Sequence, residues 1–441
     1  MPPALDLKSA ARRIFTETLS AIDIGETLRR KFARSGSRIQ CCGVEVDLAR
    51  HSRIRVVALG KASHAMAEGL VSVCAPDFPL GGILVGPTPP PRPLAGFKDF
   101  VAGHPVPNDQ SFAAARAILK MLGECGADTL VFFLLSGGGS ALVELPLDPT
   151  IPLEDFQTMH RALVGCGAPI DDINAVRKHL SAVKGGRLSA AAPQAMKITL
   201  GVTDVPEGRE SALASGPTLP DPTTIADARR VVEQFHLLPV LPTSIGAKFT
   251  APGGLIETPK PDNPAFKRAH FEIVLGMHDL FHHAHIAAES AGFQTICDNT
   301  TDDWPLERAA EFLLGELDRF ARECPGRPVA VIADGEVSSP VHGDGVGGRN
   351  SAFVLECMWK IAGRRIAVLS AGTDGIDGSS PAAGAVATGG SLARALSSGL
   401  DPADFARRSD SYNFFNKLGD AIITGPTGNN LRDLRILLAA E

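Results

Sequence analysis

Residues 134–142 read LLSGGGSAL, three consecutive glycines flanked by serines inside an apolar stretch. The preceding residues 129–135, TLVFFLL, have the length and the β-branched and aromatic content of a buried strand. The glycines remove every Cβ from the turn and permit positive φ, so backbone amides can approach an anion closely. Ser140 would then cap a following helix. This order predicts an anion site at the carboxyl end of a parallel sheet.

A flexible connection is the simpler interpretation of this turn, because glycine-rich turns are common. Comparable glycine-rich loops recur, however, at residues 334–350, 370–378 and 424–430. Each loop follows an apolar run that is typical of a strand. Together the loops favour one large cleft that handles phosphate groups.

Composition describes a globular chain whose 441 residues are enough for two domains. The net charge of −6 and the scarcity of tyrosine and tryptophan give no reason to expect nucleic acid or a membrane surface as a partner. Eight cysteines occur without a CxxC pair, and we interpret them as reduced packing residues of a cytoplasmic protein. We find no secretory signal and no apolar run long enough to span a bilayer.

Strand-like runs alternate with helical periodicity along most of the chain, which predicts an α/β fold with a largely parallel, helix-flanked sheet in each of two domains. Residues 236–265 are proline-rich and aperiodic, so we place the domains at 1–250 and 265–441. One or two amphipathic helices are expected within residues 8–34. The strands expected in the second half are 271–275, 294–297, 328–333, 365–369 and 421–424.

Charged residues near the strand ends are the candidates for chemistry. Lys61 follows the strand-like run 53–59 in a Gly-Lys-Ala-Ser turn, where a P-loop lysine would face phosphate. The second glycine of a Walker motif is absent, so a solvated loop lysine is the alternative. Asn174, Arg177 and Lys178 share one helical segment and could orient an acidic substrate, although charged helix faces are usually only solvated.

Two aspartates and one histidine complete the candidates from spacing. Asp204 follows the strand-like run 196–202 and could bind a metal, act as a base or cap a helix. Asp374 lies in a glycine turn, where an Asx turn is the alternative to a metal ligand. His104 could be a base, and we favour a hydrogen-bonded loop histidine.

The chain resembles the glycerate 2-kinases that carry a C-terminal MOFRL domain, and the resemblance covers nearly its whole length. Its motifs occur in one order: GKAS at 60–63, GHPVP at 103–107, LSGGGSAL at 135–142, INAVRKHLS at 173–181, KGGRL at 184–188, ASGPT at 214–218 with DPTT at 221–224, GGRN at 347–350, GTDGIDG at 372–378 and TGPT at 424–427. Members of this family are also labelled hydroxypyruvate reductases.

The resemblance implies an N-terminal Rossmann-like domain and a C-terminal MOFRL domain with the active site in the cleft between them. It also implies transfer of phosphate from ATP, with Mg²⁺, to the 2-hydroxyl of D-glycerate, giving 2-phosphoglycerate. A lysine and an arginine are essential in the family, and here they fall on Lys61 and Arg349.

We combine these expectations into one hypothesis for the site. Lys61, Arg349 and Asp204 are the expected catalytic residues, and Asp374 and Asp204 the expected Mg²⁺ ligands. Backbone amides are expected to hold phosphate at Ser136, Gly137, Gly138, Gly139, Ser140, Gly347 and Gly348. Asn174, Arg177, Lys178 and Asn350 are the expected substrate contacts. For Arg349, an ion pair with a carboxylate is the alternative.

Two other functions remain open at this point. A nicotinamide-dependent hydroxypyruvate reductase would need a GxGxxG turn that opens a βαβ unit, and residues 343–348, GDGVGG, do not fit that spacing. The family usually carries acidic residues near Ser351 and Ser380, which motivates a degenerate member that binds nucleotide or hydroxy acid without turnover. The sequence does not fix the oligomeric state, for which a homodimer is one candidate.

Overall fold

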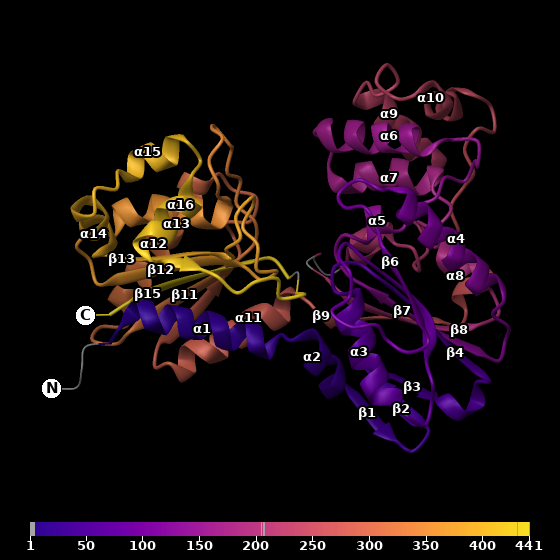
Figure 1. Cartoon of the computed structure of the whole chain (residues 1–441), viewed down its shortest axis with the longest axis horizontal. Helices are drawn as coiled ribbons and strands as arrows, with labels where there is room; N and C mark the ends of the chain where they lie inside the picture. The colour runs from indigo at the N-terminus through magenta and orange to yellow at the C-terminus, as the bar shows by residue number, and fades with distance from the viewer. Residues whose placement is uncertain (1–4, 204, 206–207, 430, 441) are drawn as a thin grey trace. The chain divides into compact units, whose positions relative to one another are not determined.

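The computed structural model describes residues 5–203, 205, 208–429 and 431–440, and Figure 1 labels most of its helices and strands. The chain divides into two compact units, Ile24–Leu275 and Met1–Asp23 with Gly276–Glu441. We call them the inserted unit and the terminal unit. The boundaries of these units fall at residues 23/24 and 275/276. The first helix, α1 (Leu7–Ala21), joins the terminal unit because it packs against α11 (Met277–Ser290), β12 (Ile366–Gly372) and β15 (Asp433–Ala439).

The inserted unit contains two sheets and a set of surrounding helices. Its strands are β1 (Phe32–Ser35), β2 (Arg38–Cys41), β3 (Val44–Asp47), β4 (Arg53–Leu59), β5 (Gly81–Gly86), β6 (Phe97–Val101), β7 (Thr129–Leu135), β8 (Met196–Val202) and β9 (Ala269–Leu275). Its helices are α2 (Ile24–Lys31), α3 (Ser63–Cys74), α4 (Asp109–Gly123), α5 (Gly139–Leu142), α6 (Leu153–Gly165), α7 (Ile170–Leu180), α8 (Arg187–Ala191), α9 (Ile225–Gln234) and α10 (Thr243–Thr250).

The main sheet of this unit has the order β6-β5-β4-β7-β8-β9, and all its neighbouring strands pair in parallel. The predicted α/β class is confirmed. Every residue of the central strand β7 is buried, which explains its continuous apolar sequence. Leu59 of β4 lies opposite Leu135 of β7, so the loops after these strands start at the same edge. The segment expected to open the second sheet, 271–275, instead pairs with β8 as β9.

The terminal unit has one sheet with helices on both faces. Its strands are β10 (Gln294–Asp298), β11 (Val329–Asp334), β12 (Ile366–Gly372), β13 (Gly384–Thr388), β14 (Ala421–Ile422) and β15 (Asp433–Ala439). Its helices are α1 (Leu7–Ala21), α11 (Met277–Ser290), α12 (Leu306–Glu323), α13 (Arg349–Lys360), α14 (Ser391–Ser397), α15 (Pro402–Arg407) and α16 (Ser411–Leu418).

This second sheet is mixed, which corrects the expectation of a largely parallel one. Its order is β10-β11-β15-β12-β13-β14, and among these pairs only β10–β11 is parallel. The last strand, β15, inserts antiparallel between β11 and β12. Its sequence, DLRILLA, is rich in residues that favour helices, so local propensity does not mark it as a central strand.

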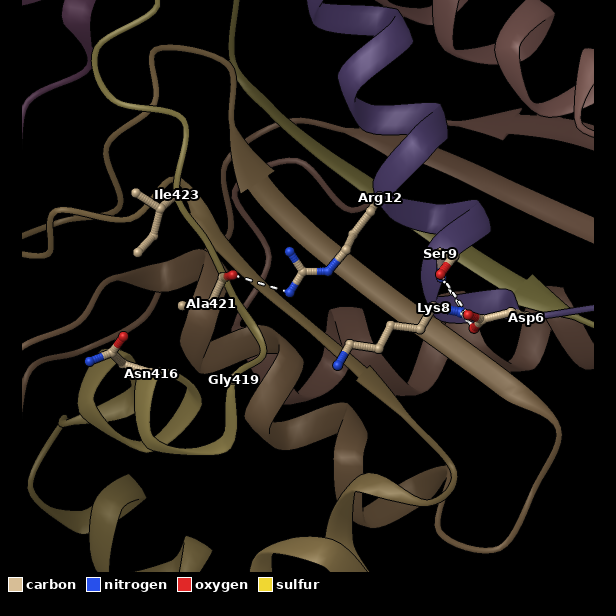
Figure 2. A pocket seen from close by; sticks show the side chains of 8 residues that line it. All are labelled: Asp6, Lys8, Ser9, Arg12, Asn416, Gly419, Ala421 and Ile423. Atoms are coloured by element: carbon tan, nitrogen blue, oxygen red, sulfur yellow. Dashed lines mark hydrogen bonds between the residues drawn. The ribbon is translucent and has the colours of Figure 1, made fainter.

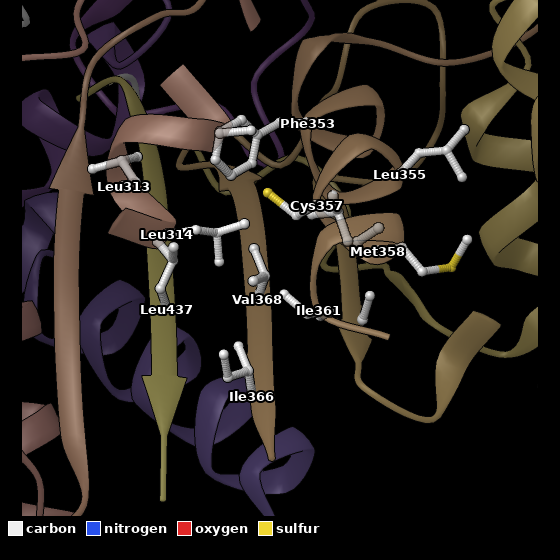
Figure 3. Packing of buried hydrophobic residues seen from close by; sticks show 14 of the residues in the cluster. Leu313, Leu314, Phe353, Leu355, Cys357, Met358, Ile361, Ile366, Val368 and Leu437 are labelled. Carbon is white, nitrogen blue, oxygen red and sulfur yellow. The ribbon is translucent and has the colours of Figure 1, made fainter. Parts of the chain in front are cut away.

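The core of the terminal unit forms where α12 and α13 cover this sheet. Figure 3 shows Phe353 and Cys357 of α13 facing Val368 of β12 and Leu437 of β15, and all four are fully buried. On the N-terminal side, the prediction of helices within residues 8–34 is confirmed by α1 and α2. All eight cysteines are free thiols. No helix in the described ranges has both the length and the apolar character needed to cross a membrane.

Candidate active site

The glycine loop of the inserted unit is tied to the loop that carries Lys61. The Ser136 amide donates to the carbonyl of Leu59 at 3.0 Å, and the Lys61 amide donates to the carbonyl of Gly137 at 2.9 Å. The buried hydroxyl of Ser136 accepts the Ala62 amide at 3.0 Å. These bonds place Lys61 beside the glycines and give the Ser136 side chain a structural role.

At Gly138 both the backbone conformation and the surrounding side chains favour glycine. Its φ is +85°, and a Cβ there would lie 3.0 Å from Cδ2 of His104 and 3.5 Å from Cγ of Lys61. The prediction that Ser140 caps the following helix is wrong, because α5 begins at Gly139 and its N-cap is Gly138. The shorter loop leaves Ser140 inside the helix, where its hydroxyl meets that of Ser215 at 2.6 Å.

Four successive amides in this loop are available to a ligand. Within the described part of the chain, the N–H groups of Gly137, Gly138, Gly139 and Ser140 donate to no protein acceptor. Gly137, Gly138 and Ser140 are partly exposed. Consecutive amides without protein partners form a concave positive surface that suits an anion such as phosphate.

His104 lies against this loop, in surroundings that favour its neutral form. Burial lowers the pKa of His104, and the nearby positive charge of Lys61 lowers it further. Sequence spacing favoured a hydrogen-bonded loop histidine at this position. The structure instead places its ring beside Gly138 and Lys61.

The three expected substrate contacts of α7 have different surroundings. Asn174 Oδ1 accepts the Ser215 hydroxyl at 2.9 Å, so Ser140 must donate to Ser215 in the neighbouring 2.6 Å contact. Lys178 is buried and its ammonium bonds Asp221 at 3.1 Å. Arg177 is 8% exposed, and its Nε has no hydrogen-bond partner within the described residues.

A buried ion cluster supports the far end of α5. The Lys184 ammonium donates to Ser140 O at 2.7 Å, to Val143 O at 3.3 Å and to Glu144 Oε2 at 2.6 Å. Glu144 Oε1 accepts from Ser181 Oγ at 2.5 Å, and Glu144 Oε2, the atom that binds Lys184, also contacts His160 Nε2 at 3.2 Å. Although burial raises the pKa of Glu144, Lys184 and His160 outweigh it and lower the pKa to about 2.

We did not predict the roles of Glu144, Lys184 and Asp221 from the sequence. Each pairs with a residue about forty positions away, 40 for Glu144 and Lys184 and 43 for Lys178 and Asp221. Such separations carry no local spacing signal. The available clues were the charge of Lys184 inside the KGGRL motif and that of Asp221 at the start of the DPTT motif.

In the terminal unit, Arg349 is the first residue of α13 and is held by two carboxylates. Its Nη1 donates to Glu336 Oε2 at 2.7 Å, its Nη2 contacts Glu336 Oε1 at 2.6 Å, and its Nε donates to Asp433 Oδ2 at 2.5 Å. Glu336 follows β11 and Asp433 begins β15. The antiparallel insertion of β15 therefore supplies one of the two carboxylates that bind Arg349.

The N-terminus of α13 is closed by Asp377. Its carboxylate accepts the amides of Asn350 at 2.9 Å and Ser351 at 2.8 Å, together with the Ser351 hydroxyl at 2.5 Å. A Cβ on Gly348 would lie 2.3 Å from Asp377 Oδ1, so glycine permits this approach. Burial raises the pKa of Asp377 above its ordinary value, although these hydrogen bonds oppose the rise.

The remaining expected contacts of this unit are engaged within the protein. The Gly347 amide donates to Ser379 Oγ at 3.3 Å, and the Gly348 amide donates to Ser351 Oγ at 3.4 Å. Asn350 is buried and accepts the Ser370 hydroxyl at 2.6 Å. The amides at 137–140 are therefore the ones best placed to take an external phosphate.

Asp374 and Asp204 were the expected metal ligands. Asp374 is half-buried, and its Oδ1 accepts the Ile376 amide at 3.0 Å, which forms an Asx turn. Asp204 lies outside the described residues. In the ranges that the structure describes, no three His, Cys, Asp or Glu side chains are arranged to hold a metal ion.

Comparison with known proteins decides the family. A model described as a domain of unknown function, DUF4147, matches residues 10–250, and the MOFRL family model matches residues 329–433. The D-glycerate 2-kinase of Thermotoga maritima is 35% identical over 387 residues, which cover 87% of this chain and 90% of that protein. This chain belongs to the glycerate 2-kinase family.

Two further members extend this relationship. A protein named putative hydroxypyruvate reductase from Agrobacterium vitis is 37% identical over 433 residues, which cover 96% of each chain. A crystal structure of a glycerate kinase from Thermotoga maritima matches with a TM-score of 0.84 and 31% identity, over 98% of this chain and 99% of that one. As a member of the glycerate 2-kinase family, the chain is a kinase.

Proposed function

We propose that this protein transfers the γ-phosphoryl group of ATP to the 2-hydroxyl of D-glycerate, giving 2-phosphoglycerate. The names of its relatives support glycerate as the acceptor. One structural observation carries the proposal: the four amides of residues 137–140 have no protein acceptor within the described chain, beside Lys61. A row of open amides next to a lysine suits the phosphates of a nucleotide.

The residues of the inserted unit would act mainly through position and charge. Phosphoryl transfer requires aligned reactants and neutralisation of charge, with little covalent participation by the protein. The amides of 137–140 would fix phosphate oxygens, and Lys61 would stabilise charge on the transferring group. Arg177, whose buried Nε is unpartnered within the described residues, is the strongest of the α7 candidates for the glycerate carboxylate.

Lys178 and Asn174 would act less directly. Because Asp221 neutralises Lys178, we assign that lysine to positioning α7 against residue 221. Asn174 connects through Ser215 to Ser140 of the glycine loop, and would align the loop with the substrate side of α7. In the terminal unit we assign Arg349 to stabilising transition-state charge, with Glu336 and Asp433 fixing its orientation.

Mg²⁺ fits the donors present if the nucleotide supplies most of its ligands. Mg²⁺ in such enzymes keeps several waters and is held by one or two carboxylates together with substrate phosphates. The half-buried carboxylate of Asp374 has one oxygen on the Ile376 amide and suits such a partial site. We propose Asp374 and Asp204 as its protein ligands. When bound, the ion would neutralise charge on the phosphates.

A coupled ADP-release assay tests this function. ATP and Mg²⁺ are supplied with D-glycerate, L-glycerate, tartronate or hydroxypyruvate, and the product is passed to enolase. We expect turnover with D-glycerate and a product that enolase accepts, because enolase acts on 2-phosphoglycerate. ADP release with a product that enolase rejects would refute the assigned phosphorylation position.

The name of the Agrobacterium relative gives a second candidate, an NAD(P)H-dependent hydroxypyruvate reductase. The same samples, given NADH or NADPH with hydroxypyruvate, separate the two functions. Oxidation of the nicotinamide without ADP release would favour the reductase. Nucleotide binding by calorimetry without turnover on any acid would favour a member that binds without catalysis.

A further inference from the structure

The terminal unit contains a hollow that the proposed kinase reaction does not use. It has a volume of about 560 Å³ and lies between the first turns of α1 and residues 416–423 (Figure 2). Lys8 and Arg12 line it from α1, and Asn416, Gly419 and Ile423 line it from the other side. This volume is within the usual range for small-molecule sites, roughly 300–1,000 Å³.

The carboxylates at this hollow are already bound by protein groups. Asp6 caps α1, accepting the amides of Lys8 at 3.1 Å and Ser9 at 3.3 Å and the Ser9 hydroxyl at 2.5 Å. Asp420 is buried and pairs with both Lys8 and Arg394. The charge of Asp420 is therefore neutralised by two protein cations, and the carboxylate of Asp6 is engaged by the first turn of α1.

Two carbonyl groups in the last turn of α16 are engaged as well. The Gly419 amide donates to Asn416 O at 3.2 Å, and the Asp420 amide donates to Phe415 O at 2.8 Å. Each of these two carbonyl oxygens thus already accepts a hydrogen bond from the protein.

Hydrogen-bond donors, by contrast, remain open. Arg12 donates from Nη2 to Ala421 O at 3.2 Å, while its Nε and Nη1 have no protein partner among the described residues. Lys8 uses one of its three ammonium protons on Asp420. The two residues are four positions apart, so they extend from one face of α1, as Figure 2 shows.

We propose that this hollow binds a small phosphate-bearing metabolite, with the phosphate on Arg12 and Lys8 and the carbon part against Ile423. An arginine beside a lysine offers a planar fork and a point charge, which suit a dianionic phosphate. Ile423 is 61% exposed and supplies an apolar wall on the other side. A bare inorganic ion would leave that wall unused.

Phosphorus NMR titration of the full chain with inorganic phosphate, at fixed ionic strength, tests the charged half of the site. Arg12→Gln should weaken this binding tenfold or more, since it removes charge-assisted hydrogen bonds. Arg13→Gln is the matched control, because Arg13 is on the same helix, does not line the hollow and lies 3.9 Å from Glu17. It should stay within twofold of wild type.

The number of phosphate sites per chain separates this hollow from the active site. Arg12→Gln should remove one site and leave phosphate bound elsewhere unchanged. If Arg12→Gln and Arg13→Gln weaken phosphate binding equally, the proposal is overturned. The loss would then follow from the lower net charge of the protein and not from a site at Arg12. If Arg12→Gln lowers the melting temperature by more than a few degrees, Lys8→Gln replaces it under the same criteria.

Glycerol 3-phosphate tests the apolar half of the site. We expect it to bind several-fold more tightly than inorganic phosphate at the site that Arg12→Gln removes. Ile423→Ser should abolish that difference and leave the affinity for inorganic phosphate unchanged. Equal affinities for the two probes in the wild-type protein would overturn the assignment of an organic phosphate.

Discussion

The guanidinium of Arg349 lies against the carboxylate of Glu336, with Nη1–Oε2 at 2.7 Å and Nη2–Oε1 at 2.6 Å. Asp433 accepts from its Nε on the other side. Burial lowers the pKa of Arg349, but the carboxylates of Asp433 and Glu336 have the larger effect. The pKa of Arg349 is therefore above the ordinary arginine value. Arg349 is therefore a fixed cation whose orientation is set by the end of β11 and the start of β15.

If Arg349 stabilises the transferring phosphoryl group, Arg349→Ala should lower kcat about a hundredfold or more. Lysine restores the charge without the planar fork, so Arg349→Lys should recover only part of that loss. Steady-state kinetics with ADP release measures both. Arg364→Ala is the control, because Arg364 pairs with Asp318 at the surface. If the kcat of Arg349→Ala stays within a few-fold of wild type, the catalytic role of Arg349 is refuted. Its ion pairs with Glu336 and Asp433 would then be purely structural.

Lys61 can be tested without removing its aliphatic stem. Lys61→Met keeps the carbon chain beside Gly138 and removes the ammonium. We expect kcat/KM to fall about a hundredfold or more, with the melting temperature changed little. Loss of the Lys61 charge should also let the pKa of His104 rise, because Lys61 contributes to lowering it. NMR titration of His104 reports this shift even where turnover is absent, and an unchanged kcat/KM would refute the catalytic role.

Gly138 can be tested against a glycine of similar backbone conformation. Gly138→Ala introduces a Cβ at φ +85° and 3.0 Å from the His104 ring, whereas Gly167→Ala introduces one at φ +75° into open space. Both should lose about 1 kcal/mol of stability, because the left-handed region is unfavourable for alanine. Activity should fall strongly in Gly138→Ala alone. Equal kinetics in the two variants would mean that the 137–140 amides do not bind the reacting phosphates.

Because of the Glu144–Lys184 pair, the free energy of unfolding of the inserted unit should decrease in acid. The pKa of Glu144 is about 2 in the folded state, below the ordinary value of 4.5. A lowered carboxyl pKa adds stability above about pH 4.5, which is lost as the pH falls toward 2. The total is roughly 3 kcal/mol. Urea unfolding between pH 6 and 3 should show this loss in the wild type and a weaker one in Glu144→Gln.

Breaking the same pair should be costly at neutral pH. Lys184→Met leaves Glu144 buried with only its contacts to His160, Ser181 and the Leu145 amide, so we expect a loss of about 3–5 kcal/mol. The double variant Glu144→Gln with Lys184→Met should be more stable than Lys184→Met alone, since it removes the uncompensated charge. If the double variant is less stable than both single variants, the loss in Lys184→Met does not arise from the unpaired charge of Glu144.

Asp334 should give the terminal unit a pH dependence of the opposite sign. It is fully buried, and both its carboxylate oxygens lack a partner within the described chain. Burial raises its pKa to about 6; Asp302 adds to the rise, whereas Arg432 and Arg435 oppose it. A raised carboxyl pKa makes the folded state lose stability as the pH rises from 3.8 to about 6. The loss is roughly 3 kcal/mol.

Asp334→Asn isolates this effect. The variant should lack the decline in unfolding free energy between pH 4 and 6, because asparagine does not ionise. Hydrogen exchange of β11 and β15 amides measures the terminal unit separately from the inserted one. A wild-type protein whose β11 protection rises over this range would contradict the raised pKa.

Local sequence patterns were sufficient for the glycine loop but not for the groups that support it. A seven-residue apolar run followed by glycines determines both β7 and its turn, so the position of residues 136–140 at a sheet edge was predictable. The assignment of Ser140 as helix cap failed because Gly138 takes that place. Lys184 and Glu144 meet only after α7 and the β7–α6 connection have packed, and no local pattern encodes that.

The terminal sheet shows the same division. The strands β11 and β12 were predictable from apolar runs that precede glycine loops. The strand between them, β15, was missed because Leu, Ala and Arg favour a helix and because Arg435 looks unsuited to a core. In the fold, Arg435 is fully buried and donates to the carbonyls of Asp334 and Gly335. The ion pair between Arg349 and Asp433 could therefore not be predicted from the sequence.

The placement of α1 in the terminal unit has a consequence for synthesis on the ribosome. The inserted unit, residues 24–275, can complete its sheet while the chain is still being elongated. The apolar face of α1, with Ile14 and Phe15, has to wait for strands made some hundreds of residues later. The nascent helix thus carries an uncovered hydrophobic stripe throughout translation of the inserted unit, and this is the kind of transiently exposed surface that chaperones shield.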